Sequence, residues 1–389
     1  MSDGTTIGVE EEFFLVDRRT RLPADRATQV VRTSRDRLGA EHVAAEIART
    51  MIETVSAVCH DGDQLSRELS RLRRGASKEA ARHGCLLVAS GVPPLGEGGP
   101  PPLQDDTRYR SMARRFGPLV HDQAVCACHV HVGVPDPEEA VQVVNHLRPW
   151  LPVLLALSCN SPVWRGEDTG YASWRTSVWG RWPTAGPPPY LESASHYEEL
   201  VSGLTESGAA LDPAMLFWFA RPSRHVPTVE VRLADVMPTA RETVAYALVV
   251  RALVTAALDD IRQGRPVPQV DGTLLAAACW QAAKEGVRGR ALDLSGRAGA
   301  STMARRVQEL RGRTEDWYHS DSERRTVSVW LDASVTHGTG ADRQRAVHAA
   351  LGDLALVDSL AVSTDGEETD GLSAPREVPE RPSTVHFRR

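Results

Sequence analysis

Three segments of the chain alternate between apolar and polar residues, and each places two functional side chains on one face of an expected strand. The segments are residues 7–16, 125–134 and 227–233, and the paired side chains are Glu10 and Glu12, His129 and His131, and Glu230 and Arg232. Successive side chains of a strand point to opposite faces, so residues two apart project together. Apolar neighbours such as Val130 and Val231 then take the buried face. The pattern predicts three strands that line one polar site on a sheet.

Longer stretches have apolar residues at the three- and four-residue spacing of amphipathic helices. The expected helices cover residues 63–83, 137–158, 239–261, 274–284 and 301–310. Asp63 is a candidate N-cap of the first helix, because a short carboxylate side chain accepts hydrogen bonds from free backbone N–H groups. Pro149 and Pro152 should divide the second helix, because proline has no N–H to donate. Short apolar runs predict further strands over residues 51–55 and 85–91.

Strands and helices are mixed along the chain without regular alternation, which favours an α+β fold with an antiparallel sheet over a doubly wound fold. We expect one catalytic domain over residues 1–363, since the sequence shows no internal repeat or low-complexity linker there. Residues 364–389 are acidic and then rich in proline and arginine, so we expect a disordered tail. Residues 162–190, crowded with tryptophan and proline, are too long for a passive connection and are expected to be functional.

The composition is that of an ordinary globular protein, with 41% hydrophobic and 25% charged residues. The formal net charge of −6 gives no electrostatic reason to bind nucleic acid or anionic membranes. The apolar run over residues 244–258 contains Arg251 and is too short to span a bilayer, and we see no secretory signal. Six cysteines in 389 residues do not make a disulfide framework, so we expect a protein of the reducing cytoplasm.

The side chains of the predicted site suit divalent metal ions and phosphate. Carboxylates such as Glu10, Glu12 and Glu230 are hard oxygen ligands, which favour Mg²⁺ or Mn²⁺ over Zn²⁺. Arg232 stays protonated, and its planar guanidinium can bind a phosphate or a carboxylate through two hydrogen bonds. Glu53 adds another carboxylate within an apolar, strand-like run. The combination indicates a site that handles phosphate with the help of metal ions.

Each motif taken alone has a plainer interpretation. The acidic run at the start could lie on a solvated edge strand, and the two histidines could be structural. Glu230 and Arg232 could form a structural ion pair, and Glu53 could be paired in a similar way. Cys126 and Cys128 are interpreted as a core pair rather than a metal clamp, because no second cysteine pair lies near them in the sequence. The metal interpretation is favoured because all three motifs interrupt apolar strands at the same two-residue spacing.

Seven segments of the chain form a series that can be compared with known families. They are GVEEEFFLVD (residues 8–17), RY (108–109), CHVHVGV (128–134), LALSCNSPVW (155–164), DTGYASWR (168–175), TVEVR (228–232) and GTGADRQR (338–345). In sequence and in order they resemble the glutamate–cysteine ligase type 2 family, the bacterial carboxylate–amine ligases. The resemblance implies a curved antiparallel sheet backed by helices, similar to the catalytic domains of glutamine synthetase and the guanido kinases.

The resemblance also implies an ATP-dependent ligase that joins a carboxylate to an amine through an acyl phosphate, with glutamate and cysteine as default substrates. The residues that would then hold two or three Mg²⁺ (or Mn²⁺) ions are Glu10, Glu12, Glu53, His129 and Glu230. Arg232 would neutralise the transferring phosphoryl group, and His131 would lie close to the phosphates. Arg175 and Arg181 are candidates for a second clamp on phosphate or a substrate carboxylate. The expected ligands are ATP, the metal ions and small-molecule substrates, and a homodimer is left open.

The chain departs from the family pattern at Ala127, Ala278 and Gln281, so the acid and the amine stay open at this point. Two other classes of protein also fit part of the pattern. A zinc hydrolase of the amidohydrolase type begins with His-x-His on a strand, and it would contain stoichiometric zinc and need no ATP. A homologue that binds ligands without turnover would keep the fold and release no ADP.

Overall fold

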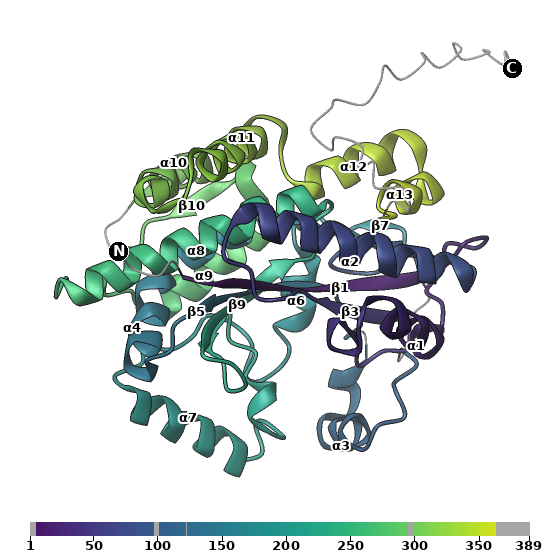
Figure 1. Ribbon diagram of the computed structural model, residues 1–389, viewed down its shortest axis with the longest axis horizontal. Helices are drawn as coiled ribbons and strands as arrows, with labels where there is room; N and C mark the ends of the chain where they lie inside the picture. The colour runs from purple at the N-terminus through teal and green to yellow at the C-terminus, as the bar shows by residue number, and fades with distance from the viewer. Residues whose placement is uncertain (1–4, 97–100, 122, 295–298, 363–389) are drawn as a thin grey trace, which may run out of the picture.

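The sheet at the centre of the molecule has seven strands, and β1 lies in its middle (Figure 1). The computed structural model describes residues 5–96, 101–121, 123–294 and 299–362. The strands of the sheet are β1 (Ile7–Asp17), β2 (Val43–Ala45), β3 (Met51–Val55), β4 (Cys85–Val88), β5 (Ala127–Gly133), β8 (Ala220–Pro222) and β9 (Thr228–Asp235). Their order is β2-β3-β1-β5-β9-β8, with β4 paired to the end of β1, and the pairs are antiparallel. This architecture confirms the expected α+β class.

Two long helices, α2 (Gly62–Arg82) and α8 (Ala240–Arg262), cover one face of the sheet (Figure 1). Their apolar stripes supply much of the core; Leu65, Leu69 and Leu72 of α2, for example, are fully buried. The other helices are α1 (Ala27–Leu38), α3 (Thr107–Phe116), α4 (Pro137–Leu147), α5 (Leu151–Leu157), α6 (Trp174–Trp179), α7 (Ala194–Glu206), α9 (Gly272–Glu285), α10 (Met303–Thr314), α11 (Asp321–His337), α12 (Gly340–Leu351) and α13 (Asp353–Ser359). Among these, α10 and α11 pack outside α8.

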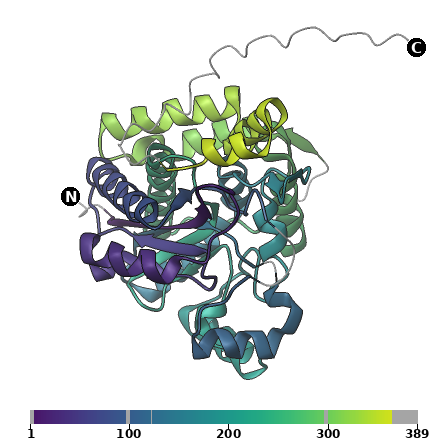
Figure 2. The same ribbon diagram turned by 90° about the vertical axis from the view of Figure 1, so that its right-hand side faces the viewer.

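On the other side of the sheet lie α3 and the segment that follows α7 (residues 207–219). These two parts lie together on the side of the sheet away from α2 (Figure 2). Arg108 of α3 joins them through an ion pair with Asp212, with Nε 2.7 Å from Oδ2. Residues of the sheet and of these two parts line the cleft that holds the candidate site.

Alternation along β1 sends neighbouring glutamates to opposite faces of the sheet. The residues at odd positions, Ile7, Val9, Phe13 and Leu15, are at most 1% exposed. Glu11 belongs to this buried set, and its carboxylate accepts hydrogen bonds from Arg73 Nε of α2 (2.9 Å) and Thr243 Oγ1 of α8 (2.7 Å). Glu10 and Glu12 therefore project from the opposite face.

Of the predicted helix breaks and caps, Pro149 lies at a break as expected, whereas Pro152 lies in the first turn of α5 and the cap of α2 differs. The helix expected over residues 137–158 is divided into α4 and α5 by a short 3₁₀ turn that contains Pro149. One cap was predicted wrongly: the N-cap of α2 is Asp61, whose side chain accepts a hydrogen bond from Gln64 N at 2.7 Å, whereas Asp63 lies within the first turn. Asp61 has the extended backbone of an N-cap residue, which the sequence pattern does not reveal.

The segment over residues 162–190 is less irregular than expected, because it contains α6 and the short β6–β7 hairpin (Val163–Trp164 and Glu167–Asp168). The tail expected over residues 364–389 lies outside the described residues. The single domain up to residue 363 stays a prediction. Among the helices that the structure describes, none combines the length and apolar composition of a membrane span.

Candidate active site

Pairing between the central strands brings the predicted side chains together on the face opposite α2 and α8. Glu10 lies opposite His129, and Glu12 lies opposite Glu53. On the next pair of strands His131 lies opposite Glu230. The period-two motifs of β1, β5 and β9 therefore share one surface, with the β3 glutamate at its edge.

These side chains line a cleft of about 350 Å³. Its polar lining consists of Glu10, Glu12, Glu46, Glu53, Arg108, Tyr109, His129, His131, Arg221, Ser223, His225, Glu230 and Arg232, and its apolar lining of Ile47, Met112, Trp179, Ala214, Phe217 and Val226. The sheet forms the floor, while α3 and the segment after α7 form the walls. Acidic, basic and aromatic groups are therefore gathered in a single cleft.

The two histidines are held by Glu10. His129 Nδ1 lies 3.0 Å from Glu10 Oε2, and His131 Nε2 lies 3.4 Å from Glu10 Oε1. The other ring nitrogen of His131 is hydrogen-bonded to Thr228 Oγ1 at 2.9 Å. Burial raises the pKa of Glu10, but the hydrogen bonds from His129 and His131 outweigh it and hold that pKa below its ordinary value.

Two overlapping clusters of this cleft have the ligand atoms that a metal ion needs. Glu10, Glu53 and His129 form one cluster, and Glu12, Glu46 and Glu53 form the other. In each cluster the possible ligand atoms lie within 4.8 Å of one another. Glu46 was missed by the sequence reasoning. It follows the three-residue strand β2 and has no period-two partner, so its one signal was a lone carboxylate between apolar residues.

In these clusters, the cationic groups nearby do not offset burial and mutual repulsion at Glu46 and Glu53. Burial, together with the carboxylates of Glu12 and Glu10, raises the pKa of Glu46 to about 8. Burial, with Glu46 as the next cause, also raises the pKa of Glu53 well above its ordinary value. Carboxylates that crowd together in a cleft and repel one another destabilise the fold by themselves, but they can bind a cation.

The donor set fits Mg²⁺ or Mn²⁺. Carboxylate oxygens predominate, with one imidazole, which is the pattern expected for hard divalent cations rather than zinc. The Nε2 atom of His129 is buried and has no hydrogen-bond partner among the described residues, and it lies 3.9 Å from Glu12 Oε1. A buried ring nitrogen without a partner, facing a carboxylate, is consistent with a ligand position.

Glu230 lies at the basic end of the cleft. Its two carboxylate oxygens accept hydrogen bonds from Arg221 Nε (2.8 Å) and Arg232 Nη1 (3.1 Å), and Oε1 lies 4.0 Å from His129 Nδ1. Although burial raises the pKa of Glu230, Arg232 and Arg221 lower it to about 2. The ionised carboxylate thus anchors two arginines beside the candidate metal clusters, and its role as a metal ligand stays a prediction. Arg221 was missed, because β8 is too short to show a period.

Arg175 and Arg181 are not among the residues found to line the cleft. Arg175 is buried, and its guanidinium donates to the backbone carbonyls of Leu233 (3.1 Å) and Arg232 (3.4 Å). Arg181 donates to the carbonyls of Val178 and His121. Direct contact of either arginine with a ligand stays a prediction that these backbone contacts do not support.

The positions that depart from the family pattern also lie outside the described cleft lining. Ala278 and Gln281 belong to α9, and neither lines the cleft. Ala127 lies at the start of β5, where its backbone N–H donates to Glu12 Oε2 at 2.7 Å. That bond is made by the main chain, so it does not depend on the side chain at position 127.

The acidic clusters predict a pH-dependent stability of the metal-free protein. With a folded pKa of about 8 and an unfolded pKa of about 4.3, Glu46 keeps a proton in the folded state that the unfolded chain releases. The free energy of unfolding should therefore fall as pH rises from about 5 to 8. Melting temperatures in a chelator at several pH values test this, and Glu46→Gln should flatten the fall. The exposed Glu41 offers a matched control, since Glu41→Gln should leave the slope unchanged. An identical slope in wild type and Glu46→Gln would contradict the prediction.

Comparison with known protein families gives a match over almost the whole chain. The model of glutamate-cysteine ligase family 2 matches residues 6–357. A protein named "Putative glutamate--cysteine ligase 2-1" from Saccharopolyspora erythraea is 46% identical over 373 residues, which cover 94% of this chain and 96% of that protein. A protein of the same name from Rhodococcus jostii is 43% identical, over 91% of this chain and 95% of that protein.

Solved structures show a similar fold at low sequence identity. A glutamate–cysteine ligase from Francisella tularensis, in complex with AMP, superposes with a TM-score of 0.68 at 12% identity, over 96% of this chain and 91% of that chain. A bifunctional glutathione synthetase from Pasteurella multocida superposes with a TM-score of 0.65 at 14% identity, over 92% of this chain and 52% of that one. The sheet and its helical layer are thus shared with these enzymes.

Proposed function

Because this chain belongs to glutamate-cysteine ligase family 2, an ATP-dependent ligase family, we propose that it joins a carboxylate to an amine through an acyl phosphate. Glutamate and cysteine are the first substrates to test, as the names of its relatives suggest. The observation that carries the proposal is the single cleft in which buried carboxylates and a histidine face Arg221 and Arg232.

The acidic half of the cleft would hold the metal ions. Glu10, Glu53 and His129 would bind one Mg²⁺ or Mn²⁺ ion, and Glu12, Glu46 and Glu53 would bind another. Such ions neutralise the phosphates of ATP and orient them for transfer. The chain's own contribution is to fix the ligand atoms: Ala127 N–H holds Glu12, and pairing of β1 with β3 and β5 holds the rest.

The basic half of the cleft would bind the group that is transferred. Phosphoryl transfer needs little covalent help from a protein but much positioning and neutralisation of charge. Arg232 is fixed by Glu230 and lies against the ring of Phe217, with its guanidinium carbon 5.6 Å from the ring centroid. A guanidinium held in this way can meet charge that develops on the phosphoryl group as the substrate carboxylate attacks. Trp179 and Phe217 line the cleft beside Arg232, and these rings would limit the access of water to an acyl phosphate.

The competing interpretations fit the site less well. A zinc hydrolase would be expected to offer mostly nitrogen or sulfur ligands, but the clusters found among the described residues contain four carboxylates and one histidine. A homologue without turnover would have no need for a complete acidic and basic lining, and the cleft has both.

The products of ATP cleavage test the proposed chemistry. With Mg²⁺, glutamate and cysteine, we expect stoichiometric ADP and phosphate, because an acyl phosphate forms by attack at the γ-phosphorus. The amide should have the combined mass of the two substrates less one water, since one carboxylate oxygen leaves with the phosphate. Nucleotide chromatography and mass spectrometry measure these products, and chelation of the metal should abolish them. AMP and pyrophosphate as the products would refute the acyl phosphate. ADP release with other acids or amines would keep the mechanism and change the substrates.

A further inference from the structure

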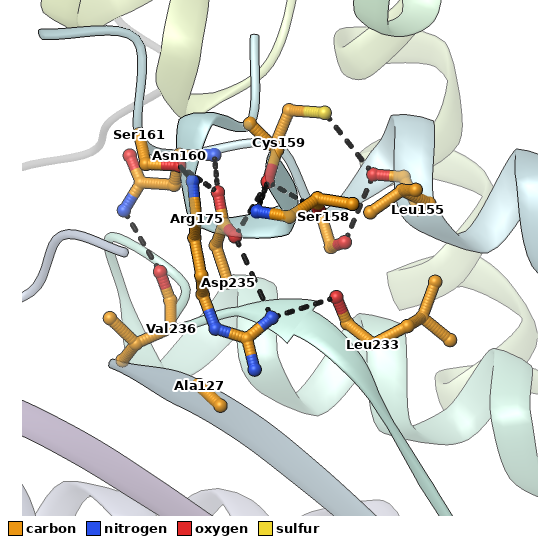
Figure 3. Close-up of polar contacts among 12 residues, drawn as sticks. Ala127, Leu155, Ser158, Cys159, Asn160, Ser161, Arg175, Leu233, Asp235 and Val236 are labelled. Carbon is orange, nitrogen blue, oxygen red and sulfur yellow. Dashed lines mark hydrogen bonds and ion pairs between the residues drawn. The ribbon is translucent and has the colours of Figure 1, made fainter. Parts of the chain in front are cut away.

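A buried polar network lies next to the cleft, around Asp235 at the end of β9 (Figure 3). Asp235 is fully buried, and its carboxylate accepts hydrogen bonds from Asn160 N (2.8 Å), Ser161 Oγ (2.7 Å) and Ser173 Oγ (2.9 Å). Its Oδ1 atom also lies 4.0 Å from Nη1 of Arg175. Each of these partners comes from outside the sheet, so the network ties the loops beside the cleft to the end of a sheet strand.

Three of the family-like segments that the cleft does not explain meet in this network. The segment over residues 155–164 supplies Asn160 and Ser161, and the segment over residues 168–175 supplies Ser173 and Arg175. The segment over residues 338–345 supplies Gln344, whose Nε2 donates to both the backbone oxygen and the side-chain oxygen of Asn160 at 2.8 Å. Two of these segments therefore contact the buried carboxylate of Asp235 directly, and the third contacts it through Asn160.

The pairing of β5 with β9 is irregular at the point that the network reaches. Cys128 lies opposite Ala234 and Val130 lies opposite Val231, so Arg232 and Leu233 together face the single residue His129. Two residues opposite one is the definition of a β-bulge, and a bulge re-aims the side chains around it. The bulge itself contains the predicted phosphate-binding arginine, Arg232, and lies opposite a predicted metal ligand, His129.

Arg175 holds this bulge. Its Nη1 donates to the carbonyl of Leu233 at 3.1 Å and its Nη2 to the carbonyl of Arg232 at 3.4 Å, and the guanidinium lies along β9 (Figure 3). Its own backbone N–H donates to Ser161 Oγ at 3.1 Å. One planar group therefore fixes two consecutive carbonyls of the bulge, and Asp235 supplies the balancing charge.

We propose that Arg175 is a positioning residue, which holds the Arg232–Leu233 bulge and so keeps the guanidinium of Arg232 on Glu230 and directed into the cleft. The role of Arg232 in this inference rests on the proposed function. The claim that Arg175 holds the bulge rests on the geometry of the bulge alone. Arg175 would thus act through the main chain of β9, and not by the direct contact with phosphate that the sequence suggested. A misplacement of a catalytic group by about 1 Å can cost on the order of 100-fold in rate.

The variant Arg175→Lys tests the proposal. Lysine keeps the positive charge beside Asp235 but has one nitrogen, which cannot reproduce the planar contact with both carbonyls. We expect kcat to fall by about 10- to 100-fold with little change in KM for ATP. Arg148→Lys is the matched control, because Arg148 is also buried and donates to two backbone carbonyls, those of Pro188 (3.2 Å) and Val270 (3.1 Å). Its kcat should stay within about twofold of wild type, whatever its melting temperature.

A double-mutant cycle shows whether Arg175 acts through Arg232. In an Arg232→Lys background, Arg175→Lys should lower kcat by less than about threefold, since the group it positions is already changed. Independent, multiplying effects would overturn the proposal. Should Arg175→Lys not fold, Ser161→Ala loosens the network more gently, and its loss of kcat should disappear in the same background.

A crystal structure of Arg175→Lys separates this inference from the proposed function. We expect Arg232 to leave its 3.1 Å contact with Glu230 in that variant and to keep it in Arg148→Lys. An unmoved Arg232 would overturn the positioning role. This measurement needs no substrate, so it remains decisive even if glutamate and cysteine prove to be the wrong pair.

Discussion

Replacing Arg232 with lysine or alanine is expected to lower kcat by about 10²- to 10³-fold, the usual cost of losing one preorganised contact to transition-state charge. Lysine retains the positive charge but loses the planar two-point contact, whereas alanine loses both. The structure supports this expectation because Arg232 lines the cleft, is almost fully shielded and is fixed by Glu230 at 3.1 Å. Rates of ADP release at saturating substrates measure the effect.

Thermal stability distinguishes this catalytic role from a structural one. Glu230 keeps its hydrogen bond with Arg221 when Arg232 is changed, so the carboxylate does not become unpaired. Arg232→Lys should therefore melt close to the wild type. Arg224→Lys, on the connection between β8 and β9, is the control, since Arg224 is partly exposed and pairs with Glu198. A large fall in melting temperature with activity retained would make the Glu230–Arg232 pair structural, and a stable, fully active variant would remove Arg232 from the mechanism.

Replacing Arg73 with methionine is expected to lower the free energy of unfolding by about 3–5 kcal/mol, the cost of leaving a buried charge without its partner. Arg73 and Glu11 are both buried between the sheet and its helices, and Arg73 also donates to the carbonyls of Met237 and Pro238. Denaturant unfolding followed by circular dichroism measures the loss.

The burial of the Arg73–Glu11 pair, rather than its charge, should decide how far the free energy of unfolding falls. Arg262 also makes an ion pair, with Glu139 at 3.0 Å, but its side chain is 58% exposed. Arg262→Met should cost less than about 1 kcal/mol. Changing Glu11 to leucine in the Arg73→Met protein should recover part of the loss, because an apolar replacement of a buried pair is often tolerated. Equal losses for Arg73→Met and Arg262→Met would contradict the argument.

The sequence could predict the floor of the site because strands impose a period of two. Glu10, Glu12, His129, His131, Glu230 and Arg232 all line the cleft, as the alternation required. Glu46 and Arg221 had no such period to reveal them, since one follows a three-residue strand and the other belongs to one. Their proximity to the site is set by the order of the strands, which is information about long-range pairing that local patterns do not contain.

The arginines of the 162–190 segment show a second limit. A cationic side chain in a tryptophan-rich loop is compatible with ligand binding or with support of the main chain. Arg175 lies behind the cleft because α6 begins at Trp174 and turns its guanidinium toward β9. The direction of one side chain depends on where a six-residue helix starts, and a boundary of that accuracy is beyond sequence patterns.

The three consecutive glutamates of β1 make the strand intolerant of a slip in register. A shift by one residue would turn Glu10 and Glu12 toward α2 and α8 and send Glu11 into the cleft, because side chains alternate strictly. Two carboxylates would then compete for the single guanidinium of Arg73 in a dry interior, and the acidic clusters would lose two of their members. The Arg73–Glu11 ion pair thus favours the observed register of β1 over the registers that are shifted by one residue. Glu11, the one member of the acidic run that lies on the buried face, therefore helps to define the register of β1.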